Sequence, residues 1–478
     1  MTRSLLGLLA ICGALALSWP VAAAETGELV TLELVDHWVG ISAIVIFVAA
    51  YSLVIFEEFT HLRKSKPVML GAGVIWVLIA YEYASRNLTG AVEAAIGEFL
   101  IEFSELFLFL LVAMTYVNAM SERNIFAALR SWLVRQGYGY KRLFWITGGI
   151  TFFLSPVIDN LTAALVMSAV ALAVGKGNAR FVTLSCVNIV VAANAGGAFS
   201  PFGDITTLMV WQHGTVEFQT FLALFAPSLV NYLVPAILMY LAVPNENPHV
   251  DNGTVTLKRG SKRILFLFAC TVATTVAFHN FLHLPPFLGM MTGLVYLKFF
   301  GYYLRKTHVP QPTDTPDYGE AGDVQPFDSF KHVASIEWDT LLFFFGIIMC
   351  VGGLGFIGHL EQLSQYFYVE LGPTIANVLV GLLSAVLDNI PIMVAVLQMN
   401  PSMDVAQWLL VTLTAGVGGS LLSIGSAAGV ALMGQARGTY TFFSHLRWSP
   451  AIALGYGLSV LTHLALNARY ANLVPELH

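Results

Sequence analysis

The chain has 478 residues, of which 57% are hydrophobic and 11% are charged, and its formal net charge is −6. Soluble domains carry about 25% charged residues, so this composition excludes an ordinary soluble domain and indicates a protein solvated by lipid. The apolar segments do not alternate apolar with polar residues, which also excludes a transmembrane β-barrel.

The N-terminal segment has the pattern of a secretory signal peptide. The basic start MTR precedes an apolar stretch, and small residues occupy positions 22–24. This arrangement predicts cleavage near Ala24. An uncleaved first membrane span is the alternative interpretation of the same residues.

Apolar segments long enough to cross a bilayer core of about 30 Å recur along the rest of the chain. Lipid cannot satisfy exposed backbone groups, so these segments are predicted to be helices. They lie near 37–56, 67–84, 95–119, 181–211, 218–242, 264–282, 285–303, 338–357, 404–434 and 448–468. The basic amphipathic segment 121–136 is predicted to lie on the inner leaflet, with an ordinary connecting helix as the alternative.

Two further apolar stretches, 142–174 and 373–399, are interrupted by the polar sequences SPVIDN (155–160) and LDNIPI (387–392). A polar, proline-bearing break at membrane depth is tolerated only where it lines a cavity or packs inside protein. Both stretches are therefore predicted to be re-entrant helical hairpins, which enter and leave the membrane on one side.

The distribution of positive charge supports this topology. If neither hairpin crosses the membrane, only Arg86 and Arg469 of the mature chain fall on the outer side, a strong positive-inside pattern. The residues expected on the cytoplasmic side are Arg63, Lys64, Lys66, Arg135, Lys141, Arg142, Lys176, Arg180, Lys258, Arg259, Lys262, Arg263, Arg305, Lys306, Arg437 and Arg447. The protein is thus expected in the bacterial inner membrane, with the mature N-terminus and the C-terminus in the periplasm.

Three segments of the first half match three segments of the second half in the same order. IEFSELFLFLL (101–111) resembles IEWDTLLFFFG (336–346), SPVIDNLTAALV (155–166) resembles SAVLDNIPIMVA (384–395), and GGAFSPFGDITT (196–207) resembles GGSLLSIGSAAG (418–429). The matches pair Glu102 with Glu337, Asp159 and Asn160 with Asp388 and Asn389, and Asp204 with Ser426. Since one hairpin would enter from the inside and the other from the outside, the repeats are expected to be inverted.

The predicted fold is an all-α polytopic membrane protein with two inverted repeats, each containing a re-entrant helical hairpin and a broken transmembrane helix. Paired broken helices in inverted repeats are typical of secondary transporters, whose site lies where the breaks meet. The predicted parts are a signal peptide (1–24), a first repeat with leading helices (25–242), a cytoplasmic linker (243–262) and a second repeat (263–478). A second flexible cytoplasmic loop is expected at 304–335.

Three aspartates within apolar stretches, Asp159, Asp204 and Asp388, are the strongest candidates for chemistry. A carboxylate near the bilayer centre costs about 3 kcal/mol on insertion scales, so such residues are functional candidates by default. The repeat favours Asp159 and Asp388, because Asp204 has no acidic counterpart. The alternative is that each acid is protonated or hydrogen-bonded and only caps a broken helix.

The surrounding oxygen atoms suit a small hard cation such as Na⁺, which is predicted to bind at the three aspartates. If cation and proton compete for one carboxylate, exchange of the two follows. The predicted ligands are Ser155, Asp159, Asn160, Thr162, Asn194, Asp204, Thr206, Thr207, Ser384, Asp388, Asn389, Ser423 and Ser426. The hydroxyl groups have an alternative role, because Ser and Thr in membrane helices often bond backbone carbonyls.

Glu98, Glu102 and Glu105 share one helix face. Glu102 and its repeat partner Glu337 are candidates for a proton relay or an accessory site. The alternative for Glu337 is an acidic first turn at a helix N-terminus, together with Asp339. No phosphate-binding glycine loop and no histidine pair at metal spacing occurs in the sequence, so we expect no enzyme, no cofactor beyond the transported ions and no nucleic-acid partner.

The motifs SPVIDNLTAALVM, NAGGAFSPFGDITTLMVW and SAVLDNIPIMVAV resemble those of the NhaD family of bacterial sodium/proton antiporters, within the ion transporter superfamily. The resemblance covers roughly residues 37 to 470. It implies exchange of sodium or lithium for protons, a role in sodium and pH homeostasis and frequent homodimerisation. By motif match, it also implies that Asp159, Asn160, Asp204, Thr206, Thr207, Asp388, Asn389 and Ser426 line the ion path.

The main alternative is an anion permease of the same superfamily, for sodium/dicarboxylate symport or arsenite efflux. Dicarboxylate carriers of this type have Ser-Asn-Thr at the hairpin tips, whereas the tips here read Asp-Asn. An acid at the site repels an anion and favours a cation. A membrane scaffold or sensor without transport would leave the three matched segments unexplained.

Overall fold

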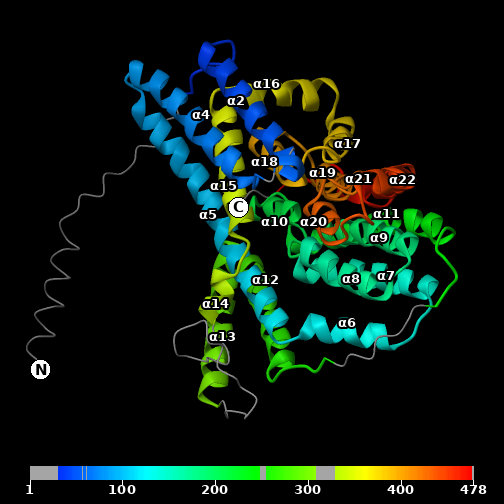
Figure 1. The fold of residues 1–478 in the computed structure, drawn as a ribbon. Helices are drawn as coiled ribbons and strands as arrows, with labels where there is room; N and C mark the ends of the chain where they lie inside the picture. Colours follow the sequence, from blue (N-terminus) through cyan, green and yellow to red (C-terminus); the bar gives the residue numbers. More distant parts are fainter. Residues whose placement is uncertain (1–30, 56, 61, 248–254, 308–328, 476–478) are drawn as a thin grey trace, which may run out of the picture.

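The computed structural model describes residues 31–475 except 56, 61, 248–254 and 308–328. All regular elements among these residues are helices, which confirms the all-α class (Figure 1). The predicted signal peptide (1–24) and most of the two predicted loops lie outside the described residues.

Nine helices of the described residues are long and apolar enough to cross a membrane, which confirms a polytopic membrane protein. They are α2 (Trp38–Ile55), α4 (Ser65–Ser85), α5 (Thr89–Glu122), α9 (Ala179–Gly197), η1 with α11 (Phe218–Leu224 and Phe225–Tyr240), α12 (Ser261–Leu282), α13 (Pro286–Lys306), α15 (Trp338–Phe356) and α22 (Ser449–Leu466). Most bounds fall within a few residues of the predicted ones. The exception is α5, whose 34 residues extend the predicted segment 95–119 at both ends.

The helices are interrupted at the positions where the sequence predicted hairpin tips and broken helices. The first hairpin consists of α7 (Tyr140–Ile158) and α8 (Asn160–Val174), and the second of α17 (Pro373–Leu383) and α18 (Asn389–Met399). The predicted apolar stretches 181–211 and 404–434 are each divided at their glycines. The first becomes α9 and α10 (Ile205–Gln212), and the second becomes α19 (Val405–Gly418) and α20 (Ala427–Gln435).

Several contacts of the first hairpin have counterparts in the second. Ser155 Oγ donates to the carbonyl oxygen of Ala193 on α9 at 2.6 Å, and Ser384 Oγ donates to that of Ala415 on α19 at 2.8 Å. Such paired contacts are expected from two copies of one structural unit. The inverted orientation of these units across the membrane stays a prediction.

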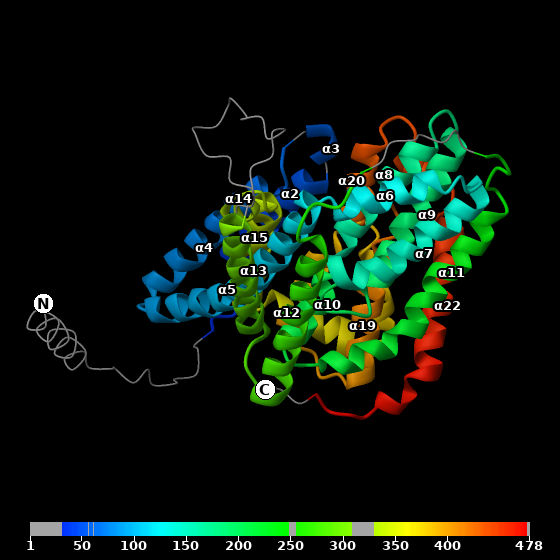
Figure 2. The same ribbon diagram turned by 90° about the horizontal axis from the view of Figure 1, so that it is seen from below.

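The helices form two groups, seen in two views (Figures 1 and 2). One contains α2, α4, α5, α13 and α15, and the other contains the first hairpin with α9, α11 and α22. Helix α15 packs against α4, α5 and α18, so it joins the first group to the second hairpin.

Short helices occupy several connections for which the sequence predicted no element. They are α3 (Glu57–Thr60), α14 (Ser329–Ala334), α16 (His359–Ser364), η2 (Gln365–Glu370), α21 (Phe442–Leu446) and η3 (Ala468–Tyr470). Helix α6 (Ile125–Arg135), the predicted interfacial helix, packs against α5 and α8.

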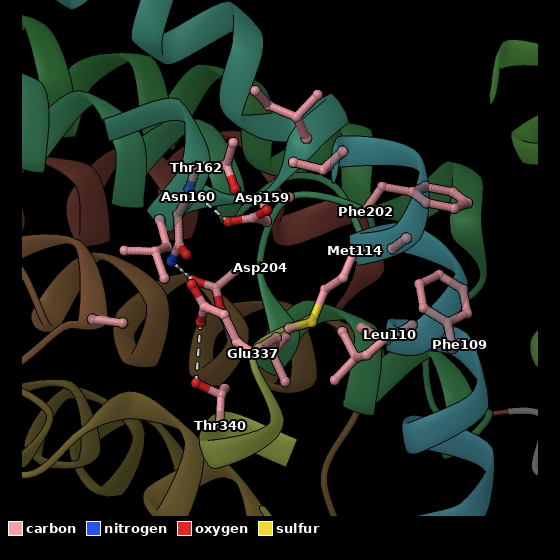
Figure 3. Close-up of a pocket in the computed structure, with 18 of the residues that line it drawn as sticks. Phe109, Leu110, Met114, Asp159, Asn160, Thr162, Phe202, Asp204, Glu337 and Thr340 are labelled. Carbon is pink, nitrogen blue, oxygen red and sulfur yellow. Dashed lines mark hydrogen bonds between the residues drawn. The ribbon is translucent and has the colours of Figure 1, made fainter. Parts of the chain in front are cut away.

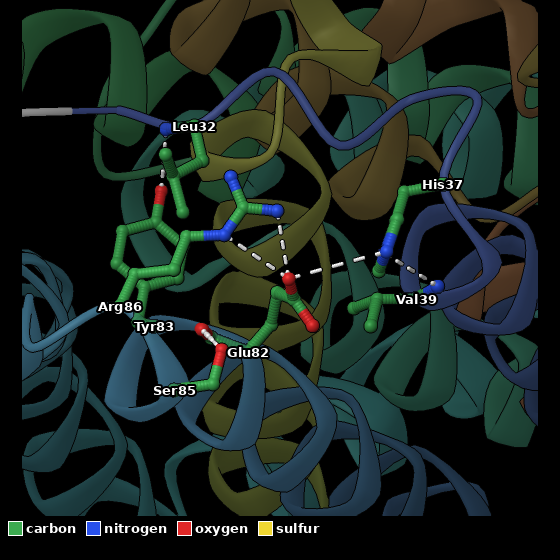
Figure 4. Close-up of polar contacts among 7 residues, drawn as sticks. All are labelled: Leu32, His37, Val39, Glu82, Tyr83, Ser85 and Arg86. Atoms are coloured by element: carbon green, nitrogen blue, oxygen red, sulfur yellow. Dashed lines mark hydrogen bonds and ion pairs between the residues drawn. The ribbon is translucent and has the colours of Figure 1, made fainter.

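The first described residues are tied to the end of α4 (Figure 4). Tyr83 Oη accepts a hydrogen bond of 2.8 Å from the backbone N–H of Leu32. The Glu82 carboxylate accepts two hydrogen bonds from Arg86, at 2.7 and 3.1 Å, and His37 Nε2 lies 4.0 Å from the same oxygen. These contacts hold the segment before α2 against the C-terminal end of α4.

Candidate functional site

Both hairpin tips contact a single carboxylate, that of Asp204, and Figure 3 shows the contact from the first hairpin, through Asn160. Asn160 Nδ2, at the start of α8, donates to Asp204 Oδ2 at 3.2 Å. Asn389 Nδ2, at the start of α18, lies 3.2 Å from both carboxylate oxygens. Asp204 is only 3% exposed and precedes α10, so a buried acid at a helix break is held by one amide from each hairpin.

Further polar groups of the two broken helices complete this centre. Asn194 of α9 accepts from Asn160 at 3.3 Å and donates to Ser426 Oγ at 3.0 Å. The backbone N–H of Thr206 donates to Asp204 Oδ1 at 3.1 Å. The hydroxyl oxygens of Thr206 and Ser423 are buried and have no hydrogen-bond partner within the usual distance, but neither residue lines the cavity described below.

Close backbone approach explains the glycine at the break before Asp204. The backbone N–H of Asn160 donates to the carbonyl oxygen of Gly203 at 2.9 Å, which joins the hairpin tip to the broken helix. A Cβ atom at Gly203 would lie 2.7 Å from Pro156 Cα and 2.8 Å from the Ser155 oxygen. Only glycine fits this contact, because any side chain would collide with backbone atoms.

Asp159 caps helix α8 and also lines the same cavity as Asp204, so its predicted role in cation binding stays a prediction. Its Oδ1 accepts a hydrogen bond of 2.8 Å from the backbone N–H of Thr162 (Figure 3). Its backbone has φ of 75° and ψ of 154°, a region occupied almost only by glycine and costly by about 1–3 kcal/mol for other residues. The strained cap lies on the same cavity as Asp204.

Asp388 has a different environment from Asp159. Its backbone N–H donates to Tyr51 Oη at 3.1 Å, and its Oδ2 lies 3.5 Å from Lys64 Nζ. Lys64 lies in the α3–α4 turn, outside the matched repeat segments. The sequence analysis assigned this lysine only to the cytoplasmic surface, so it missed Lys64 as a site residue.

The hydroxyl groups of Ser155, Ser384 and Thr207 bond backbone carbonyls. The first two join each hairpin to a broken helix, and Thr207 Oγ1 donates to the Ala198 oxygen at 3.3 Å. These three residues therefore hold the helices of the site together. The aspartates also remain apart: among the residues that the structure describes, no group of three or more His, Cys, Asp or Glu could hold a metal ion.

A cavity of about 120 Å³ lies at this centre. At about 30 Å³ for each water in the liquid, it has room for on the order of four water molecules. Its charged lining residues are Asp159, Asp204, Glu337 and Lys64. Three carboxylates against one ammonium group make the cavity suited to a cation.

Comparison with known proteins agrees with these features. The chain is 57% identical over 461 residues to the Na⁺/H⁺ antiporter NhaD of Alkalimonas amylolytica, covering 94% of this chain and 95% of that protein. It is 55% identical over 458 residues to the Na⁺/H⁺ antiporter NhaD of Vibrio cholerae, covering 94% and 96%. The chain belongs to the NhaD family. Its NhaD relatives are named as antiporters, which are transporters and not enzymes, and the resemblance found in the motifs is confirmed.

More distant relatives place the NhaD family in a wider group. The chain is 32% identical to sodium/proton antiporter 1 of Arabidopsis thaliana over 464 residues, covering 94% of this chain and 76% of that protein. A family model described as "Citrate transporter" matches residues 4–416.

A second cavity, of about 1050 Å³, lies at the other end of the same helices in this NhaD-family chain. Its lining includes Glu98, Glu102 and Glu105 of α5, together with the C-terminal ends of α10 and α18. The N-terminal ends of α10 and α18 line the first cavity instead. Helices α5, α10, α15 and α18 thus connect the two cavities.

The repeat-related glutamates are separated by this arrangement. Glu102 lines the second cavity, and Glu337 lines the first, where it accepts a hydrogen bond of 3.2 Å from Thr340 Oγ1 (Figure 3). Next to it, Asp339 accepts a hydrogen bond from Ser65 at the start of α4. The two glutamates therefore line different cavities, and their predicted role as a proton relay stays a prediction.

Proposed function

We propose that this chain exchanges Na⁺ or Li⁺ for H⁺ across the bacterial inner membrane and so contributes to sodium and pH homeostasis. The observation that carries the proposal is the buried carboxylate of Asp204, held by amides from both hairpins in a cavity with more acidic than basic groups. The names of the NhaD relatives support the same ions.

In this mechanism the cation and the proton compete for Asp204. The charged carboxylate binds the cation, with oxygens of neighbouring groups as further ligands. An Asn side chain, such as that of Asn160 or Asn389, can present its oxygen after rotation. Protonation removes the negative charge and releases the cation. A carrier that holds either ion, but not both, exchanges one for the other.

The two cavities supply the access that such exchange requires. Positive-inside topology assigns the cavity with Glu337 to the cytoplasmic side and the cavity with Glu102 to the periplasmic side. We infer that the hairpins move relative to α5 and α15, so that Asp204 faces one cavity and then the other. Each glutamate would then conduct protons on its own side. Homodimerisation, implied by the family, would hold α5 and α15 fixed.

Anion transport, the alternative within the superfamily, receives support only from the description of the matching family model. An anion such as citrate would meet three carboxylates and a single lysine in the first cavity. Like charges at this distance oppose binding, so the lining favours a cation.

The test uses everted vesicles from cells that lack their own sodium antiporters. An acridine-orange signal reports the respiration-driven pH gradient while Na⁺, Li⁺, K⁺ or citrate is added from neutral to alkaline pH. We expect Na⁺ and Li⁺ to dissipate the gradient in the wild type but not in Asp204→Asn. The matched control is Asp404→Asn, because Asp404 caps α19 outside the first cavity. A wild type that responds to citrate and to no cation would overturn the proposal.

A further inference from the structure

Lys64 is the only basic residue among the described residues that line the first cavity. Its neighbours Arg63 and Lys66 are exposed, whereas the Lys64 side chain is only 16% exposed. It reaches from the α3–α4 turn across to the tip of the second hairpin, where its Nζ lies 3.5 Å from Asp388 Oδ2. The same nitrogen lies 4.5 Å above the ring of Phe343 on α15, which favours a cation at this position.

The negative charge of the Asp388 carboxylate is compensated by its ion pair with Lys64. Its side chain is 14% exposed, and its other oxygen, Oδ1, is buried without a hydrogen-bond partner. A carboxylate in such a place is costly unless a positive charge compensates it. Lys64 supplies that charge, and a cation that reached Asp388 could supply it equally. The two cannot occupy the same position together, because like charges at contact distance repel.

A second carboxylate, Glu57 on α3, accepts a hydrogen bond from the backbone of Lys64. Glu57 on α3 interacts electrostatically with Lys64, and burial raises the pKa of the Glu57 carboxyl group while the charge of Lys64 opposes this rise. Lys64 itself lines the first cavity, and its partner Asp388 directly precedes Asn389, which also lines it.

We propose that Lys64 is a tethered cation that occupies Asp388 when no transported ion is bound, and that Na⁺ must displace its ammonium group to load the site. Lys64 is thus a positioning residue that sets the sodium affinity of the cytoplasm-facing state. This inference rests on the proposed exchange of Na⁺ for H⁺.

The test measures the half-maximal Na⁺ concentration for exchange in everted vesicles at fixed pH. Removing the competitor in Lys64→Gln should lower this concentration by about ten-fold, which corresponds to ~1.4 kcal/mol. Lys64→Arg keeps the charge and should stay close to the wild type. Lys66→Gln removes an exposed charge two residues away and should have no effect. An unchanged or higher value in Lys64→Gln, beside a wild type that exchanges Na⁺, would overturn the inference alone.

If Lys64→Gln abolishes transport, the half-maximal Na⁺ concentration cannot be measured, and Na⁺ binding to the purified variant is measured instead. The purified variant is titrated with Na⁺ while its thermal unfolding is followed, since a bound ion stabilises the folded state. Tighter Na⁺ binding than in the wild type supports displacement, and weaker or absent binding by folded protein overturns it. The effect must also disappear in the Asp388→Asn background, because Lys64 then has no carboxylate to occupy. A wild-type protein that shows no response to Na⁺ would instead contradict the proposed function itself.

Discussion

The two hairpin tips carry the same Asp-Asn pair but use the aspartate in different ways. In the first hairpin Asp159 adopts a strained backbone and caps α8. In the second hairpin Asp388 has an ordinary φ of −53°, makes no capping hydrogen bond and pairs with Lys64. The asparagines, in contrast, both donate to Asp204.

The two repeats share their backbone features but differ in some of their charged residues. Hairpins, glycine breaks and the amide donors recur in both halves, because they build the backbone around the cavity. Two charges of the site do not recur: Asp204 corresponds to Ser426, and Lys64 lies in the α3–α4 turn, outside the matched segments. Under the proposed exchange, a site for one cation needs only one central acid, so the two halves need not carry the same charges.

The largest expected effect is on stability, and it tests whether the backbone is packed equally closely at the two helix breaks. A Cβ atom at Gly425 would lie 2.5 Å from the Ser384 oxygen, as close a contact as the one at Gly203. Gly203→Ala and Gly425→Ala should each lower the free energy of unfolding by an amount near the upper end of about 1–3 kcal/mol. Thermal unfolding in detergent measures this, with Gly149→Ala and Gly434→Ala as controls, since both positions have open space. If alanine is tolerated at one of these two glycines and not at the other, the two helix breaks are not structurally equivalent.

The next effect tests whether both asparagines serve the same carboxylate. A hydrogen bond to a charged group contributes about 1.5 kcal/mol or more, so Asn160→Ala and Asn389→Ala should each raise the half-maximal Na⁺ concentration about ten-fold. Because they share one acceptor, the double variant should show less than the sum of both effects. Asn178→Ser, at the cap of α9 outside the first cavity, should change nothing. Strict additivity would argue that the two amides act at separate positions.

The smallest effect concerns the backbone difference between the two aspartates. Glycine relieves the positive φ of Asp159, and replacing a cap by glycine costs only a few tenths of a kcal/mol, so Asp159→Gly should stabilise the protein by about 1 kcal/mol. Asp388→Gly should destabilise it by at least about 0.5 kcal/mol, because glycine adds flexibility there and the ion pair is lost. The midpoint of unfolding in detergent measures both effects. A shift in the same direction for both variants would contradict the expected difference.

The sequence predicted the helices and the members of the site better than the geometry of the site. Apolar length and polar breaks are local signals, and they located the hairpins, the broken helices and Asn160, Asn389 and Asp204. The repeat favoured Asp159 and Asp388 over Asp204, because matching segments report shared backbone and cannot report which acid is central. The Lys64–Asp388 contact joins residues 324 positions apart and depends on the packing of α4 against α15, for which no local pattern exists.

The central claim is that one proton and one cation compete for Asp204. Proton release can be measured directly when Na⁺ is added to the purified protein in weakly buffered detergent solution. The account predicts release by the wild type and by Asp404→Asn, and none by Asp204→Asn. Undiminished release by a folded Asp204→Asn variant would contradict it and move the exchanging carboxylate to another residue of the cavity.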